Sequence, residues 1–247
     1  MKVCPLPVIV IILALSGWFF YSKDKAPAPI NTATRTPTST PRISRTPAPS
    51  ALPATILLSV PFTSQAPLGN WSDPRQQDGC EEASMLMTMH WVRGTTFSSP
   101  QKAEEEILAL AEYQIEKYGH STDTSAADSA KILKEYFNYD KVRVEYDITL
   151  DEIKKELVAG NVVLVPAWGR NLPNPNFTPP GPLNHMLVIK GYDNKTQEFI
   201  TNDPGTRLGA NFRYHYTVMD EAFFDYPTGH HLPHTIQRSA MIVVEKN

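Results

Sequence analysis

The pattern of apolar and polar positions divides the chain into three parts. Residues 3–22 are apolar and uncharged, residues 23–55 are rich in Pro, Thr, Ser and Ala, and residues 56–247 combine amphipathic stretches with short apolar runs. Only the third part has the regular apolar spacing and the length that a buried core requires. We therefore expect one globular domain over residues 56–247.

Amphipathic stretches predict four helices in the first half of this domain. The expected helices cover residues 80–92, 98–117, 125–137 and 149–160. Asp78 and Glu81 have the spacing of a capping box at the first helix, and Met85 lies on its apolar stripe. Residues 66–79, which precede this helix, read as a long loop.

Short apolar runs predict strands, and most of them follow the helices. The expected strands cover residues 55–60, 162–168, 185–192, 198–202 and 240–245. A turn at residues 193–196 joins two of these runs as a hairpin. Helices first and an antiparallel sheet last predict an α+β fold.

The apolar segment 3–22 predicts a membrane anchor or a signal segment. It is long enough as a helix to cross a hydrocarbon core of about 30 Å. A cleaved secretory signal is the alternative, and its nearest cleavage site, 26–28, is followed by Pro29. We favour an uncleaved, single-pass anchor. The remainder of the chain is expected outside the cytoplasm, and it is secreted if the segment is cleaved.

Residues 23–55 predict a disordered linker, because their composition cannot form a core. Six of the 23 basic and one of the 26 acidic residues lie in 1–55, so the domain carries 17 basic against 25 acidic residues. This balance argues against a nucleic-acid partner. Two interpretations of the basic linker remain open: contact with anionic wall polymers or lipid, and a solvated spacer.

Cys80 is the candidate nucleophile. The chain has two cysteines, and Cys4 lies in the apolar N-terminal segment, so the domain cannot form an internal disulfide. A helix N-terminus favours a thiolate through its free N–H groups. Glu81 and Glu82 oppose that ionisation unless they point away. The alternative is a small buried hydrophobic residue.

His185 is the best candidate among seven histidines for the base that activates a thiol. It heads an apolar strand, whereas His90 lies nearly three turns beyond Cys80 on the same expected helix. Two other histidines, His120 and His215, have no supporting context. The cluster His230, His231 and His234 lacks acidic or cysteine ligands, so we expect no metal and no cofactor.

An acid and an amide complete the candidate site. Counting back from the hairpin turn pairs position 185 with about 204, which brings Asp203 beside His185, with Asn202 as the second choice. The amide of Gln65, Gln76 or Gln77 could stabilise a developing oxyanion, and spacing alone does not choose among them.

Four motifs in this order resemble a known family. They are V-P-F-T-S-Q ending at Gln65, D-G-C-E-E-A-S around Cys80, N-H-M-L-V-I-K-G-Y around His185 and I-T-N-D-P around Asp203. Residues 58–245 resemble the C39-like branch of the double-glycine leader peptidase-like group, within the papain-fold cysteine peptidases. The resemblance implies a papain-like fold with Cys80 as nucleophile, His185 as base, Asp203 as its orienter and Gln65 as oxyanion donor.

The chain departs from this family's pattern in two places. Cys80-Glu81-Glu82 stands where the family often has Cys-Gly-Pro, and a longer insertion separates Gln65 from Cys80. These residues match no transporter region, so we do not expect coupled peptide export from the resemblance.

We therefore expect an exported cysteine peptidase-like hydrolase acting on a peptide or protein substrate. A non-catalytic peptide- or wall-binding module on a stalk is one alternative. Transglutaminase-like acyl transfer, or amide hydrolysis of cell-wall peptides, is another that the same residues would serve.

Overall fold

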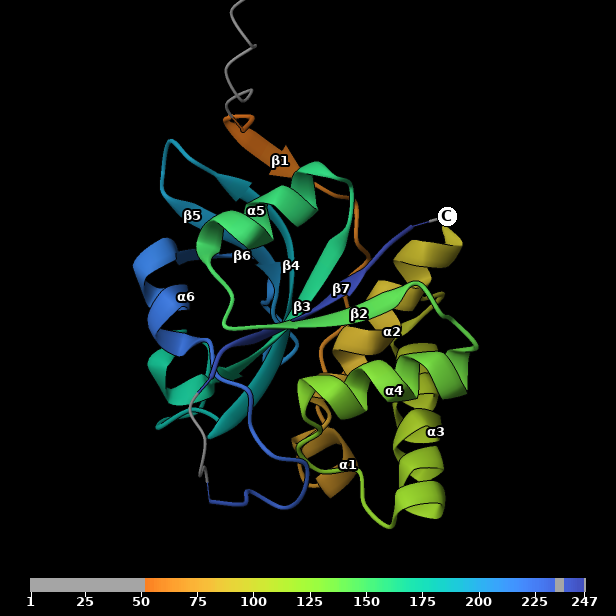
Figure 1. Ribbon diagram of the computed structural model, residues 1–247. Helices are drawn as coiled ribbons and strands as arrows, with labels where there is room; N and C mark the ends of the chain where they lie inside the picture. The colour runs from red at the N-terminus through yellow and green to blue at the C-terminus, as the bar shows by residue number, and fades with distance from the viewer. Residues whose placement is uncertain (1–51, 234–237, 247) are drawn as a thin grey trace, which may run out of the picture. The chain divides into compact units, whose positions relative to one another are not determined.

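An antiparallel sheet with strands of unequal length is the centre of the computed structural model, which describes residues 52–233 and 238–246 (Figure 1). Within these residues the sheet has seven strands in the order β2-β7-β3-β4-β5-β6, and β1 pairs with the far end of β4. The strands are β1 Thr55–Leu57, β2 Val142–Tyr146, β3 Val162–Trp168, β4 Asn184–Asp193, β5 Glu198–Asn202, β6 Ala210–His215 and β7 Ala240–Val244. All pairings are antiparallel, as the sequence predicts.

Helices cover both faces of this sheet. The helices are α1 Pro74–Gln77, α2 Cys80–Arg93, α3 Pro100–Tyr118, α4 Ala126–Phe137, α5 Leu150–Val158 and α6 Tyr216–Ala222, with a single 3₁₀ turn at Gly169–Asn171. In Figure 1, α2, α3 and α4 lie together on one side of the sheet, and α5 and α6 lie on the other. The structure is thus an α+β fold with an antiparallel sheet.

Alternation along the central strands produces two cores. Met186 and Val188 of β4 pack with α2 and α4, whereas Leu187 and Ile189 pack with α5 and α6. Successive side chains of a strand point to opposite faces, so a strand covered on both faces is apolar at nearly every position. This accounts for the unbroken apolar run that marks β4 in the sequence.

The helix starts follow local rules in most places. Thr149 and Glu152 form the capping box of α5, and Ser99 and Ser125 cap α3 and α4 through their hydroxyl oxygens. The capping box expected at α2 is wrong. Gly79 is the N-cap of that helix and makes no side-chain bond, while Asp78 ends α1.

Several elements differ from the sequence-based expectation. The loop expected over 66–79 contains α1, which Asp73 caps, and the sequence pattern did not indicate β2, β6 or α6. The hairpin turn lies at 194–197, one residue later than expected, and a bulge between Ile189 and Gly191 shifts the β4–β5 register. Strand β1 ends at Leu57, and it begins at Thr55, the last residue assigned to the linker.

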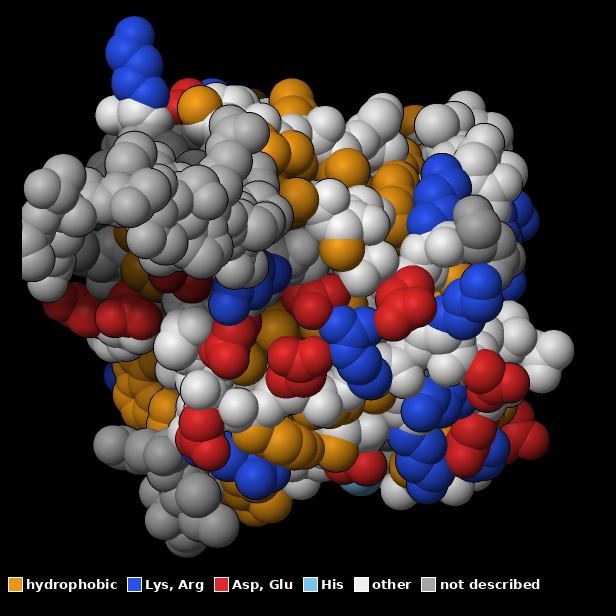
Figure 2. Space-filling model, turned by 45° about the horizontal axis from the view of Figure 1, so that its top comes forward, with side chains coloured by type: hydrophobic (Ala, Val, Ile, Leu, Met, Phe, Trp, Pro, Cys, Tyr) orange, Lys and Arg blue, Asp and Glu red, His pale blue; other side chains and the backbone are white. Residues whose placement is uncertain are grey.

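The expected membrane anchor or signal segment, 1–22, lies outside the described residues, as does the linker up to residue 51. Among the residues that the structure does describe, no helix has the length and apolar character to cross a bilayer. The described residues fall within one compact unit, Pro49–Asn247. On the face shown in Figure 2, acidic and basic side chains are interspersed.

Candidate active site

Cys80 is the first residue of α2, directly after a glycine that the fold requires. A Cβ on Gly79 would lie 2.6 Å from the carbonyl oxygen of Arg75, so only glycine allows α1 and α2 to meet this closely. Cys80 is 6 % exposed. Ser84, one turn further along α2, donates its hydroxyl to the Met186 carbonyl at 3.2 Å. This bond ties the start of α2 to the strand that carries His185.

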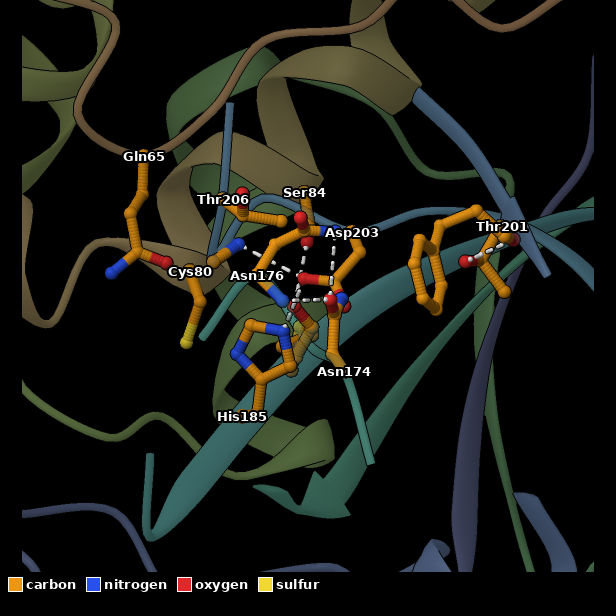
Figure 3. Close-up of polar contacts among 12 residues, drawn as sticks. Gln65, Cys80, Ser84, Asn174, Asn176, His185, Thr201, Asp203 and Thr206 are labelled. Atoms are coloured by element: carbon orange, nitrogen blue, oxygen red, sulfur yellow. Dashed lines mark hydrogen bonds and ion pairs between the residues drawn. The ribbon is translucent and has the colours of Figure 1, made fainter. Parts of the chain in front are cut away.

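His185 and Asp203 form a buried hydrogen-bonded pair. Nε2 of His185 lies 2.8 Å from Oδ1 of Asp203, and both side chains are almost fully buried (Figure 3). His185 is the second residue of β4, and Asp203 directly follows β5, the neighbouring strand. A carboxylate accepts hydrogen bonds, so Nε2 carries the hydrogen that bonds to Asp203, and Nδ1 is the ring nitrogen left for another partner. The hairpin therefore brings together the two residues that the sequence singled out, while Asn202 bonds elsewhere, to the Val60 and Pro61 carbonyls.

Two residues that the sequence did not indicate hold the Asp203 carboxylate. Its Oδ2 accepts hydrogen bonds from the Tyr214 hydroxyl at 2.5 Å and from Asn174 Nδ2 at 3.1 Å, and its Oδ1 also accepts the Gly205 N–H at 3.0 Å. Burial alone would raise the pKa of Asp203, but the nearby His185, Tyr214 and Gly205 together lower it below its ordinary value. The carboxylate is therefore charged at neutral pH. Tyr214 lies on β6, whose mostly exposed residues left no strand pattern to recognise.

A cleft of about 630 Å³ brings Cys80 and His185 to one surface. Figure 3 shows the Cys80 sulfur beside the edge of the imidazole that faces away from Asp203. The ring of Phe177, which also lines the cleft, packs edge-on against the imidazole with the ring centres 5.5 Å apart. The imidazole is thus fixed by Asp203 on one side and by an aromatic ring on another.

The glutamate that follows Cys80 points toward the thiol. Cys80 Sγ donates to Glu81 Oε2 at 3.0 Å. Burial, followed by the charge and the hydrogen bond of Glu81, raises the pKa of the Cys80 thiol well above its usual value. Glu82 points elsewhere and accepts a bond from Gln114 Nε2 at 2.5 Å. The condition that both acids turn away from the thiol therefore holds for Glu82 and fails for Glu81.

Gln65 lies in the cleft with its amide turned so that the oxygen faces Cys80 (Figure 3). Its Nε2 donates to the carbonyl oxygens of Gln76 at 3.0 Å and Gln77 at 2.7 Å. Its Oε1 is buried and has no hydrogen-bond partner among the described residues. The other two candidates differ in place, since Gln77 lines the cleft whereas Gln76 is fully buried away from solvent.

The remaining histidines have other surroundings. His90 bonds to Glu106 and Thr95 on the outer part of α2, away from the thiol. His231 lies at the cleft, with Nδ1 2.7 Å from Asp123 Oδ2, a pair that the sequence did not indicate. Within the described ranges, His, Cys, Asp and Glu side chains form no group of three or more that could hold a metal ion.

A thiol at a helix N-terminus, beside an imidazole oriented by a buried carboxylate, is the arrangement used by thiol hydrolases. The family comparison agrees with this class. Residues 57–226 match the model of the Peptidase C39 like family, and the chain belongs to that family of cysteine peptidases.

Solved structures and curated proteins were compared as well. A protein from Bacillus anthracis assigned to the C39-like peptidases has 16 % identity and a TM-score of 0.47, covering 78 % of this chain and 98 % of its own. Xylellain, a cysteine protease from Xylella fastidiosa, has 14 % identity and a TM-score of 0.33, covering 80 % and 87 %. No curated protein matches. The family assignment rests on the family model rather than on these two likenesses.

Proposed function

We propose that this chain is an exported cysteine peptidase of papain-like fold that cleaves a peptide or amide bond with Cys80, His185 and Asp203. The observation that carries the proposal is the buried His185–Asp203 pair at the cleft that also contains Cys80. A buried histidine held in one tautomer by a charged acid has its other nitrogen free to take a proton.

The reaction follows from this arrangement in two steps. His185 Nδ1 takes the proton of Cys80 as the sulfur attacks the carbonyl carbon of the scissile bond, and it then gives that proton to the departing amine. The product is a thioester on Cys80. Water then attacks the thioester carbon with His185 again as base, which releases the acid and restores the thiol.

The backbone N–H of Cys80 and the amide of Gln65 are the proposed oxyanion donors. The side-chain amide of Gln65 has two hydrogens, and both are used on the Gln76 and Gln77 carbonyls. Donation to an oxyanion therefore requires Gln65 to release one of these carbonyls when substrate is bound. The unpartnered Oε1 leaves room for that rotation without breaking a further bond.

The proposed location is outside the membrane, on a stalk. Residues 3–22 are apolar and uncharged, and at about 3.1 Å per residue the linker could hold the domain up to roughly 100 Å away. Its basic residues would contact anionic wall polymers or lipid head groups. Extraction of membranes with alkaline carbonate tests the anchor, because an anchored chain stays with the membrane and a cleaved one is released.

Cleavage assays on the full chain test the catalytic assignment. A peptide library is incubated with the wild type and with Cys80→Ser and His185→Ala, and cleavage is followed by mass spectrometry. We expect cleavage by the wild type and a loss of at least about 10³-fold in both variants. Undiminished cleavage by Cys80→Ser would contradict the proposal.

The raised pKa of Cys80 favours one other candidate, a non-catalytic peptide-binding module. A thiol that stays protonated is a poor nucleophile, while the cleft would still accept an extended chain. Peptide binding by Cys80→Ser together with no turnover by the wild type would favour this candidate.

A further inference from the structure

The carboxylate of Glu81 is enclosed within the domain and is surrounded by three donors. Glu81 is 0 % exposed. Its Oε2 accepts from Cys80 Sγ, and its Oε1 accepts from the Tyr226 hydroxyl at 2.7 Å and from the Thr124 N–H at 3.1 Å. These donors come from α2, from the segment before β7 and from the segment before α4. Glu81 is therefore a built part of the site and not a surface acid that happens to follow the cysteine.

No cation balances this carboxylate among the described residues. None of the ion pairs found in that part of the chain includes Glu81. The ionisable groups that interact with it are Cys80 and Glu82 from its own helix, Tyr226, and Asp123, which is itself paired with His231. Burial, followed by the charge of Asp123, raises the pKa of Glu81 to about 7. The carboxyl thus changes its charge near neutral pH.

A charged Glu81 and a Cys80 thiolate exclude one another. With sulfur and oxygen 3.0 Å apart, a thiolate beside a carboxylate would place two like charges next to one another in a buried part of the cleft wall. A charged Glu81 instead accepts the S–H hydrogen. A neutral carboxyl carries its own hydrogen and can donate it to the sulfur, which stabilises the thiolate.

We propose that Glu81 controls the reactivity of Cys80. The charged carboxylate of Glu81 holds the thiol in its protonated form, whereas the neutral carboxyl allows the thiol proton to pass from Cys80 to His185. This regulation rests on Cys80 as the proposed nucleophile. Two different protons are involved. The proton that neutralises Glu81 comes from solvent, and the proton that leaves Cys80 goes to His185. Activity is then limited to conditions in which Glu81 is neutral.

Alkylation of Cys80 by iodoacetamide, followed against pH on the full chain, tests the proposal. The modified peptide that contains Cys80 is quantified by mass spectrometry, because Cys4 is the other cysteine of the chain. Glu81→Gln imitates the neutral carboxyl. One pH unit above a pKa of about 7, only about one carboxyl in ten is neutral, so at pH 8 the variant should react about tenfold faster than the wild type. At about pH 5.5 the two rates should agree within about twofold.

Two further variants separate regulation from a general effect on packing. Glu82→Gln changes the neighbouring buried acid, which bonds to Gln114 and not to the sulfur. Loss of its charge would favour ionisation of Glu81, so the rate of this variant should not exceed that of the wild type at about pH 8 and should match it at about pH 5.5. Tyr226→Phe removes a hydrogen bond that lowers the pKa of Glu81. It should react faster than the wild type at about pH 8 and equally at about pH 5.5, even if Glu81→Gln does not fold.

Two results would overturn the proposal. One is that Glu81→Gln and the wild type are alkylated at the same rate at about pH 8. If Glu81→Gln does not fold, the same comparison is made between Tyr226→Phe and the wild type. The other is a rate increase of the same size at both pH values. Alkylation reports on Cys80 without any peptide substrate, so a failure to find peptidase turnover leaves this measurement interpretable. Conversely, peptide cleavage with no pH-dependent effect of Glu81 would reject only the regulation.

Discussion

Replacing Asp203 by asparagine should destabilise the domain more than the loss of one hydrogen bond would. Each oxygen of the carboxylate accepts two bonds: Oδ1 from His185 Nε2 and the Gly205 N–H, and Oδ2 from the Tyr214 hydroxyl and Asn174 Nδ2. An asparagine side chain has only one acceptor oxygen. Whichever way its amide is turned, its NH₂ group faces an N–H donor that the wild-type carboxylate satisfies.

The cost can be worked from these four bonds. With the asparagine oxygen in the place of Oδ1, the bonds from His185 and Gly205 are retained, the Tyr214 hydroxyl can turn to accept from the new NH₂ group, and Asn174 Nδ2 is left unpaired. A bond to a charged group contributes about 1.5–3 kcal/mol and a neutral one about 0.5–1.5, so each of the three remaining bonds loses about 1 kcal/mol. The donor left unpaired in a buried site lowers the stability by about 1–3 kcal/mol more. Asp203 is fully buried, so no discount for solvent screening applies. The free energy of unfolding should fall by about 4–6 kcal/mol.

Urea unfolding at neutral pH measures this change, with Asp220→Asn, at an exposed position of α6, as a control expected within about 0.5 kcal/mol of the wild type. The pKa of Asp203 is lowered in the folded state, so its stabilisation is present above its ordinary pKa of 3.8 and is lost as the pH falls through the folded value. The difference between Asp203→Asn and the wild type should therefore shrink in acid. A neutral-pH difference below about 1 kcal/mol would refute the four-donor reasoning.

Three further substitutions address the geometry of the candidate site. In Gly205→Ala the new Cβ would lie 2.9 Å from His185 Cε1 and 2.8 Å from Phe177 Cε1, so the imidazole must move. We expect kcat to fall on the order of 10²-fold in a folded protein. An unchanged kcat would show that the imidazole can move without loss of activity. Gln65→Ala should lower kcat by about 10²–10³-fold with little change in KM, whereas Gln77→Ala, in the same cleft, should leave kcat nearly unchanged; the reverse ranking would reassign the oxyanion donor.

The parts of the fold that could be predicted from the sequence are those set by local signals. The strand 162–168 is found at its expected bounds, and the expected helix over 98–117 is α3, Pro100–Tyr118, with Ser99 as its cap and Gly119 after it. Strand β2 does alternate apolar and polar residues, but its partner β7 lies almost a hundred positions later. A short alternating stretch between helices becomes a strand only through that distant pairing.

The candidate site was predictable where local structure decides it. Cys80 at a helix start and the His185–Asp203 pair across a hairpin both follow from spacing. Asn174 and Tyr214 reach Asp203 from a loop and from an edge strand, and neither lies in a motif. Their contribution follows from the packing of segments 29 and 11 positions away from Asp203, which no local pattern encodes.

The two acids after Cys80 show most clearly what the sequence could not decide. Neighbouring helical residues point about 100° apart, so at most one of Glu81 and Glu82 can face the thiol, and spacing does not say which. The Tyr226 hydroxyl, 145 positions away, donates a hydrogen bond to Glu81 and holds it near the thiol, while Gln114 donates a hydrogen bond to Glu82. Burial raises the pKa of both acids, so the folded state loses stability as the pH rises from their ordinary pKa of 4.5 through the folded values. The buried Glu82 contacts only Gln114 through its side chain, so its ionisation has no direct effect on the thiol. The buried Glu81 contacts the reactive sulfur, so its change of charge acts directly on Cys80.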